Sequence, residues 1–158
     1  MKSVIIYSTK HGTTKKVAEM ISQMAKEKPE LINLKKVKDI NLDDYDSIII
    51  GGSIHAGNVQ TRIKRFCHDH MLELSTKPLG LFLSCMEEDK AQEQFDNAYP
   101  ESLRKAAVST KLTGGEILLD KMNFLERYIV KKVGKMTETV SNIKEDKVKE
   151  LVNEMGLT

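Results

Sequence analysis

The sequence predicts a doubly wound α/β domain, with a five-stranded parallel sheet and helices on both of its faces. Short apolar runs without polar alternation are typical of strands that are buried on both sides. Amphipathic helical patterns separate these runs, as expected for βαβ units with right-handed crossovers. Pro29, Pro78 and Pro100 fall at the boundaries between the predicted elements. We therefore expect one domain over residues 1–158.

The strands are predicted from apolar runs rich in β-branched or large residues. The clearest runs are 4–7, 48–50 and 79–83. Weaker candidates are 31–34 and 108–112. Together these five runs supply the strands of the expected sheet.

The helices are predicted from apolar residues that recur at spacings of three and four. Val17, Ile21 and Met24 define the first helix, and a second pattern runs from Ile63 to Leu74. A third stretch covers 90–107 with a break at Pro100, and the last covers 148–155.

Composition excludes several classes of function. Twenty-five basic against 23 acidic side chains give a net charge of +2, too balanced to indicate nucleic-acid binding. The start, MKSVIIYST, does not read as a signal peptide, and no run has the length and apolarity of a membrane span. Cys67 and Cys85 form no C-x-x-C motif and predict neither a disulfide framework nor a zinc site. These features favour a reducing cytoplasm.

The stretch STKHGTT at 8–14 joins the first strand to the first helix. In such folds ligands bind beyond the carboxyl ends of the strands. Unpaired N–H groups of the helix, together with the hydroxyls of Ser8, Thr9, Thr13 and Thr14, predict a cradle for phosphate. Gly12 lets the backbone approach closely or adopt a positive φ. The alternative is that a threonine only caps the helix and Gly12 only turns the chain.

This loop resembles the phosphate loop of flavodoxins, which follows a T-x-T-G-x-T pattern and grips the phosphate of FMN. His11 stands here where that pattern usually has threonine. IIIGGSIHAGN and LGLFLSCMEED resemble the two loops that border the flavin ring in flavodoxin-like proteins. The resemblance covers essentially the whole chain and implies FMN as the cofactor. The cofactor-binding residues that it implies are Ser8, Thr9, Lys10, His11, Gly12, Thr13, Thr14, Ser53, Ile54, His55, Ala56, Gly57, Asn58, Ser84, Cys85, Met86 and Glu87.

Within that superfamily, YSTKHGTT, GGSIHAG and MNFLERYIVKKVGKM are most similar to the quinone-dependent protoporphyrinogen dehydrogenases. Members of that group oxidise protoporphyrinogen IX through FMN and pass the electrons to menaquinone. This resemblance implies an FMN-dependent oxidoreductase with a porphyrinogen substrate and a quinone acceptor, in porphyrin and heme biosynthesis. Two alternatives remain: an electron carrier that serves a partner redox protein, and a flavodoxin fold that has lost its flavin. Carriers are typically strongly acidic and stack the flavin on aromatic rings, whereas this chain is slightly basic and lacks Trp.

Three polar groups have competing interpretations. His55 either donates a hydrogen bond or a proton beside the flavin, or is an exposed loop residue. The motif His68-Asp69-His70 looks like a metal pair, but residues two apart on a helix point in different directions, so a solvated face is favoured. Cys85 is interpreted as a small loop residue rather than a redox thiol, and Cys67 as a core residue.

The segment 118–136 does not belong to the minimal five-strand pattern. Its apolar residues fall on one helical stripe: Leu118, Met122, Leu125, Ile129, Val133 and Met136. Five cations outweigh two acids there. Such a basic amphipathic helix either lies on an anionic membrane at the inner face of the cell membrane, or packs on the domain or a second subunit.

Overall fold

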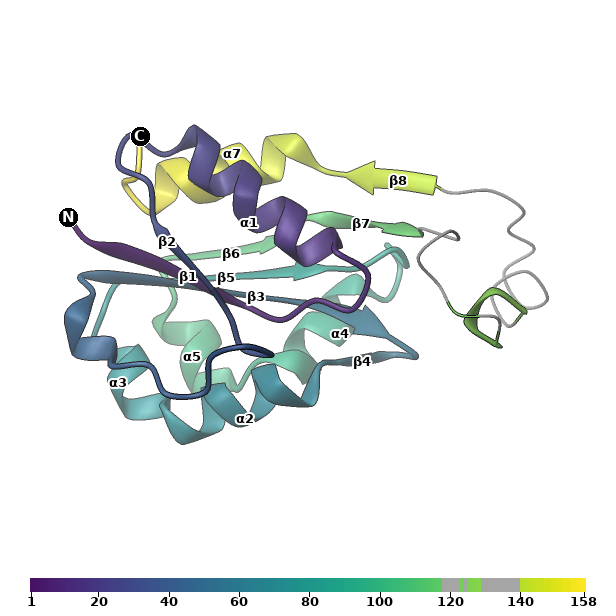
Figure 1. Ribbon diagram of the computed structural model, residues 1–158, viewed down its shortest axis with the longest axis horizontal. Coiled ribbons are helices and arrows are strands. Elements are labelled where there is room, and N and C mark those ends of the chain that lie inside the picture. The colour runs from purple at the N-terminus through teal and green to yellow at the C-terminus, as the bar shows by residue number, and fades with distance from the viewer. Residues whose placement is uncertain (118–122, 124, 129–139) are drawn as a thin grey trace.

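The computed structural model describes residues 1–117, 123, 125–128 and 140–158. Five parallel strands form its central sheet in the order β2-β1-β3-β5-β6 (Figure 1). The strands are β1 (Ser3–Tyr7), β2 (Glu30–Asn33), β3 (Ser47–His55), β5 (Leu79–Ser84) and β6 (Ser109–Leu112). All five predicted strands are thus confirmed, and β1, β3 and β5 end side by side.

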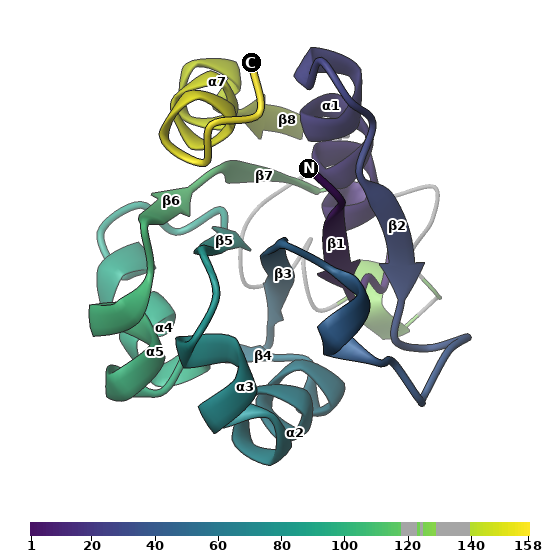
Figure 2. The same cartoon turned by 90° about the vertical axis from the view of Figure 1, so that its left-hand side faces the viewer.

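Helices cover both faces of the sheet, as predicted. One face carries α1 (Thr13–Met24) and α7 (Glu145–Glu154), which lie side by side (Figures 1 and 2). The opposite face carries α2 (Thr61–Asp69), α3 (Met71–Ser75), α4 (Ala91–Ala98) and α5 (Glu101–Ala106). A 3₁₀ turn, η1 (Leu42–Asp44), precedes β3.

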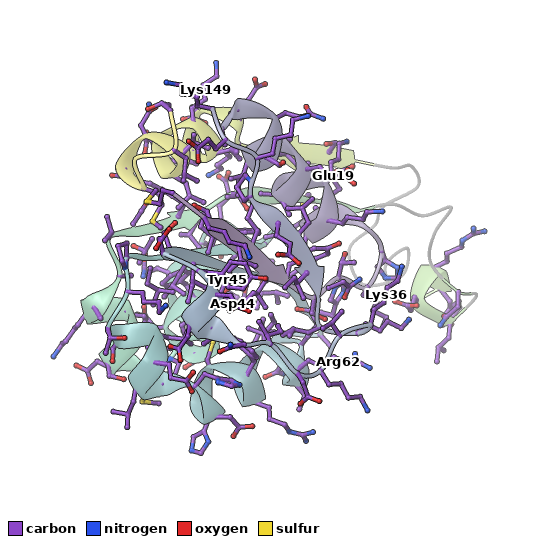
Figure 3. The ribbon with its side chains drawn as sticks, turned by 60° about the vertical axis from the view of Figure 1, so that its left-hand side comes forward. Glu19, Lys36, Asp44, Tyr45, Arg62 and Lys149 are labelled. Carbon is purple, nitrogen blue, oxygen red and sulfur yellow. The ribbon has the colours of Figure 1, made fainter. Side chains whose placement is uncertain are left out.

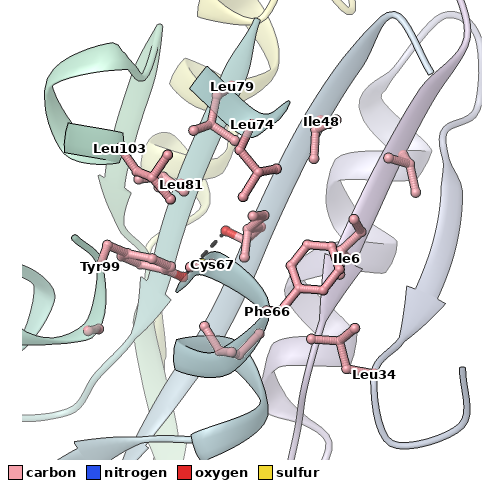
Figure 4. Packing of buried hydrophobic residues seen from close by; sticks show 14 of the residues in the cluster. Ile6, Leu34, Ile48, Phe66, Cys67, Leu74, Leu79, Leu81, Tyr99 and Leu103 are labelled. Atoms are coloured by element: carbon pink, nitrogen blue, oxygen red, sulfur yellow. Dashed lines mark hydrogen bonds between the residues drawn. The ribbon is translucent and has the colours of Figure 1, made fainter. Parts of the chain in front are cut away.

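The core consists of two apolar clusters, one on each face of the sheet. Alternate residues of β1 divide between them, since Ile6 packs with the α2–α5 side and Ile5 with the α1 and α7 side. Figure 4 shows the first cluster, in which Tyr99 lies beside Leu103. The Tyr99 hydroxyl donates to the backbone oxygen of Phe82 at 2.6 Å, so this buried polar group is satisfied.

Two predicted helices are divided more finely than the sequence pattern indicates. The 63–74 pattern forms α2 and α3, which meet at His70. The 90–107 stretch forms α4 and α5 and breaks before Pro100, as predicted. Proline lacks the N–H that would continue the first helix but fits at the start of the next one.

β3 is longer than the apolar run 48–50, which is a correction to the predicted strand. Gly51 and Gly52 continue the strand rather than begin a loop. Gly51 is paired in register with Phe82, and a Cβ at Gly51 would overlap the Phe82 ring. Glycine is therefore required here by close packing between central strands and not by a turn.

Two short antiparallel pairings were not predicted. β4 (Asn58–Val59) folds back on the end of β3, pairing His55 with Asn58. β7 (Gly114–Ile117) pairs with β8 (Val140–Ile143), so that Ile117 lies opposite Val140. Most of the predicted helical stripe at 118–136 lies outside the described residues. Within it, 125–128 form one helical turn beyond the carboxyl end of the sheet (Figure 1).

Charged side chains such as Lys36, Arg62 and Lys149 point outward from this layered core (Figure 3). Among the described helices, none has the length and apolarity needed to cross a membrane.

Candidate functional site

A cavity of about 390 Å³ lies at the carboxyl ends of β1, β3 and β5. This volume falls in the range of small-molecule sites. Of the predicted site residues, these line it: Thr9, Lys10, His11, Thr13, Ser53, Ile54, His55, Ala56, Gly57, Ser84, Cys85, Met86 and Glu87. Ser8, Gly12 and Thr14 lie next to lining residues in the first loop, and Asn58 is exposed beyond the β3 turn. The structure thus brings the three predicted loops together around one space.

The loop after β1 is shaped by Gly12, which has a φ of 98° and immediately precedes α1. The Gly12 N–H donates to Thr9 Oγ1 at 2.9 Å, and the Lys16 N–H donates to the Gly12 oxygen at 3.0 Å. The first N–H groups of α1 therefore lack intrahelical partners at the positive end of the helix dipole. That arrangement suits an anion.

Thr14 supplies a second and independent indication of an anion. Its side chain is fully buried, yet Oγ1 has no hydrogen-bond partner within the described part of the chain. A buried hydroxyl without a partner costs about 1–3 kcal/mol. Because nearly all buried polar groups in proteins are satisfied, this atom indicates that a ligand oxygen completes the loop. The residues present therefore fit a phosphate group.

Charged groups gather at the mouth of the cavity. Glu126 Oε2 lies 3.0 Å from Lys10 Nζ and 2.9 Å from His11 Nε2. Burial raises the pKa of Glu126, but hydrogen bonds from Lys10, the Asn123 backbone and His11 outweigh it and leave that pKa below its usual value. Glu126 is thus an anion that ties the 125–128 turn to the first loop.

The 125–128 turn is capped from within. The Glu126 N–H donates to Asn123 Oδ1 at 2.8 Å, and the Asn123 N–H donates to Glu126 Oε1 at 3.5 Å. This reciprocal pair is a capping box. Both carboxylate oxygens of Glu126 are therefore engaged, and its orientation toward the first loop is fixed by its own helical turn.

A second ion pair joins α1 to Glu116, which lines the cavity. Lys16 Nζ lies 3.2 Å from Glu116 Oε1 on β7, without the alignment of a hydrogen bond. The Glu116 side chain is only 5% exposed, so its charge needs this partner. The pair fixes β7 against α1 beside the cavity.

His55 ends β3 and lines the cavity. Ala56 and Gly57, with φ values of 50° and 80°, turn the chain sharply after it. His55 Nε2 lies 3.0 Å from Ser53 Oγ. Burial, together with the nearby His11 and Lys10, lowers the pKa of His55 to about 4, although Glu126 raises it. The imidazole is consequently neutral at physiological pH, and His55 is half-buried rather than an exposed loop residue.

The loop after β5 is held by a buried thiol. Cys85 Sγ donates to Gln94 Oε1 at 2.6 Å, and the Cys85 N–H donates to the Gly114 oxygen at 2.8 Å. Burial raises the pKa of Cys85, which favours the protonated thiol over the nucleophilic thiolate. Cys67 is fully buried, as predicted for a core residue.

Four lining residues were not predicted: Gln94, Gly115, Glu116 and Glu126. Gln94 could have been identified from the sequence, because it is a polar residue on the apolar face of a helix. Glu126 could not have been identified in this way, since its role depends on a contact with His11, 115 residues away in the sequence. Among the described residues, no cluster of three His, Cys, Asp or Glu side chains is arranged to hold a metal ion, and His68 is exposed beside Asp69.

Comparison with known proteins agrees with this geometry. The family model described as the flavodoxin domain matches residues 4–144. A relative from Escherichia coli K12 named protoporphyrinogen IX dehydrogenase [quinone] is 23% identical over 150 residues, covering 87% of this chain and 81% of the relative.

Two solved structures are similar in fold. A flavodoxin from Streptococcus pneumoniae TIGR4 has a TM-score of 0.64 at 11% identity, covering 99% of this chain and 98% of its own. A Fusobacterium nucleatum flavodoxin mutant bound to flavin mononucleotide has a TM-score of 0.51 at 16% identity, covering 70% of this chain and 68% of its own. Because the family model matches residues 4–144, and the three loops converge on one cavity at the start of α1, the chain belongs to the flavodoxin domain family.

Proposed function

We propose that the chain binds FMN in this cavity and is an FMN-dependent oxidoreductase of the protoporphyrinogen IX dehydrogenase (quinone) type. The buried, unpartnered hydroxyl of Thr14 at the start of α1 is the observation that carries FMN binding. An oxygen-rich anion could supply the missing hydrogen-bond partner of this hydroxyl. Membership of the flavodoxin domain family indicates that this anion is the phosphate of a flavin mononucleotide. The E. coli relative's name supports the reaction type.

In this proposal the first loop holds the phosphate through Ser8, Thr9, Thr13, Thr14 and the N–H groups after Gly12. Ile54 and Met86 supply apolar contact to the ring, and His55 a polar one. The remaining proposed contacts come from Lys10, His11, Ser53, Ala56, Gly57, Asn58, Ser84, Cys85 and Glu87. FMN when bound supplies the two-electron redox chemistry, and the protein binds, orients and shields it.

A second candidate is an electron carrier for a partner redox protein. A groove of about 390 Å³ beside the Leu34–Lys38 loop presents three cations, Lys38, Arg62 and Arg65, against one acid, Asp69, and these cations form no ion pair among the described residues. Buried Leu34 and Phe66 contribute an apolar floor. This cationic surface favours an acidic partner.

The location proposed for either function is the cytoplasm, with peripheral contact to the inner face of the membrane through 118–136. In the described turn of that segment, Leu125 and Tyr128 are 64% and 52% exposed. Exposed apolar side chains within a basic segment suit an anionic lipid surface.

The first test is the absorption spectrum of the purified protein, in which bound oxidised FMN is yellow. Extracted flavin should run as FMN in chromatography, because the loop offers one compact cradle for a terminal monophosphate. FAD as the main species contradicts the proposal, and a protein that cannot take up flavin favours a fold that has lost its cofactor. Oxidation of protoporphyrinogen IX with a quinone acceptor then separates the enzyme from the carrier.

The Gly12→Val variant tests whether the first loop binds FMN. A β-branched residue cannot adopt a φ of 98° without strain, and its side chain would block the approach of an anion. We expect FMN binding to be lost while the circular dichroism spectrum keeps its α/β shape. Unchanged flavin affinity in this variant would remove the first loop from the site.

A further inference from the structure

Ser53 and His55 at the end of β3, together with Gln60 at the start of α2, form a chain of hydrogen bonds with a fixed direction. The Ser53 N–H donates to Gln60 Oε1 at 3.0 Å. A backbone N–H can only donate, so this bond identifies the oxygen of the Gln60 amide. Gln60 Nε2 must then be the donor in its 2.7 Å bond to Ser53 Oγ.

The direction continues to the histidine. Ser53 is only 6% exposed, and the proton of its own hydroxyl needs an acceptor. Within the described residues that acceptor is His55 Nε2, at 3.0 Å. If Nε2 carried the proton instead, the serine hydroxyl would be buried without an acceptor. The network thus places the imidazole proton on Nδ1.

The charge of His55 is controlled by the groups that face it. The His11 ring stands edge-on to His55, with 5.3 Å between centroids, and the nearby charge of Lys10 disfavours a second positive charge. Glu126 is the opposing anion, but it is already paired with Lys10 and His11. Protonation of a half-buried imidazole is unfavourable in these surroundings. His55 therefore remains a neutral ring with one N–H group.

We infer that the Gln60–Ser53 pair holds His55 as a neutral Nδ1–H donor toward the flavin ring, which stabilises the reduced ring over the oxidised one. Nδ1 makes no hydrogen bond within the described part of the chain, although the imidazole lines the cavity. A donor beside the ring favours the form that carries more negative charge. Ser53 and Gln60 act as positioning residues. This inference rests on the proposed FMN function.

The first measurement needs no flavin. Nitrogen-15 NMR of the apoprotein at pH 7 should report His55 as the Nδ1–H tautomer. Ser53→Ala and Gln60→Leu should each move it toward a mixture of tautomers, because the acceptor bond at Nε2 is lost or loosened. An Nε2–H tautomer in the parent protein would overturn the inference at this stage.

The second measurement compares affinities for oxidised and reduced FMN, with the midpoint potential as the direct readout. His55→Leu should reduce the preference for reduced FMN about tenfold, which is about 30 mV for a two-electron couple. His55→Asn should retain most of the preference, since an asparagine amide can place a donor near the Nδ1 position. His68→Leu is the matched control, because His68 is 81% exposed and belongs to α2.

The outcomes separate this inference from the proposed function. If the parent binds no FMN, both fail. If FMN binds and His55→Leu leaves the potential unchanged, only the inference fails. The inference is supported if the preference for reduced FMN is lost in His55→Leu and retained in His55→Asn. An equal loss of this preference in both variants contradicts the inference, because it shows a merely steric role.

Discussion

His11 and Glu126 meet at 2.9 Å although 115 residues separate them in the chain. The same carboxylate oxygen also lies 3.0 Å from Lys10 Nζ, so one acid contacts two side chains beside the proposed phosphate loop. The contact couples the 125–128 turn to the proposed cofactor site.

Replacing this acid should strengthen FMN binding. Glu126→Gln removes a negative charge near the phosphate and leaves Lys10 and His11 free to interact with it, a gain of about 3–10-fold in affinity at low salt. The gain should shrink as ionic strength rises. Flavin fluorescence titration at two salt concentrations measures it, with Glu73→Gln at an exposed His70 pair as control. Weaker binding would show that Glu126 organises the loop instead.

Thr14→Val should separate stability from binding. The substitution removes a buried hydroxyl that has no partner, so the apoprotein should keep or slightly gain stability toward urea. FMN affinity should nevertheless fall by about tenfold or more, the cost of a hydrogen bond of about 1.5–3 kcal/mol to a charged group. A clear loss of apoprotein stability would mean that the hydroxyl has a structural role.

Gly51→Ala should destabilise the fold by about 3 kcal/mol, because the new methyl group overlaps the Phe82 ring between two central strands. Gly80→Ala is the matched control, since its nearest atom is the flexible Met155 sulfur at 3.0 Å. Urea denaturation of both variants tests the difference. Equal losses would show that the Phe82 ring can move aside.

Stability should fall on mild acidification because of His55. The ring has a pKa of about 4 in the folded protein and an ordinary value of 6.5, so folding favours its neutral form. Its contribution is fully present above pH 6.5 and is lost as pH falls toward 4. After allowance for partial exposure, we expect a loss of about 1–2 kcal/mol. Denaturation at pH 7 and 5 should show a smaller decrease in His55→Asn than in the parent.

Membrane contact can be tested through the described turn. Changing Leu125 and Tyr128 together to Ser should weaken binding to anionic vesicles, because both side chains are exposed. Lys131, Lys132 and Lys135, which lie outside the described residues, should add about 1 kcal/mol each. A charge reversal of all three to Glu should therefore reduce vesicle binding while FMN binding survives. Absence of the parent protein from floated vesicles at low salt would contradict the membrane contact.

Much of the fold could be predicted from the sequence because local patterns decide it. The apolar runs of the buried strands and the helical stripe around Val17 need no knowledge of distant residues. The first loop was predictable for the same reason, since the hydroxyls, Gly12 and the helix start are contiguous. The extension of β3 through Gly51 was not predicted, because a glycine required by a ring on the neighbouring strand carries no apolar signal.

The rest of the site depends on contacts between distant segments. Glu116 and Glu126 reach the cavity from a part of the chain that follows the last parallel strand. The direction of the Gln60–Ser53–His55 bonds depends on the short β4 strand, which only two residues define. Neither the pairing of β7 with β8 nor these charge contacts leaves a periodic signal in the sequence.

The β7–β8 pairing makes the central sheet independent of the length of the segment that joins these two strands. Ile117 and Val140 are opposite partners in an antiparallel ladder, so the two ends of the intervening segment lie side by side. Closing a longer loop between two paired strand ends costs little additional entropy. We therefore expect the length of the segment between β7 and β8 to be variable without a shift in the register of the five parallel strands.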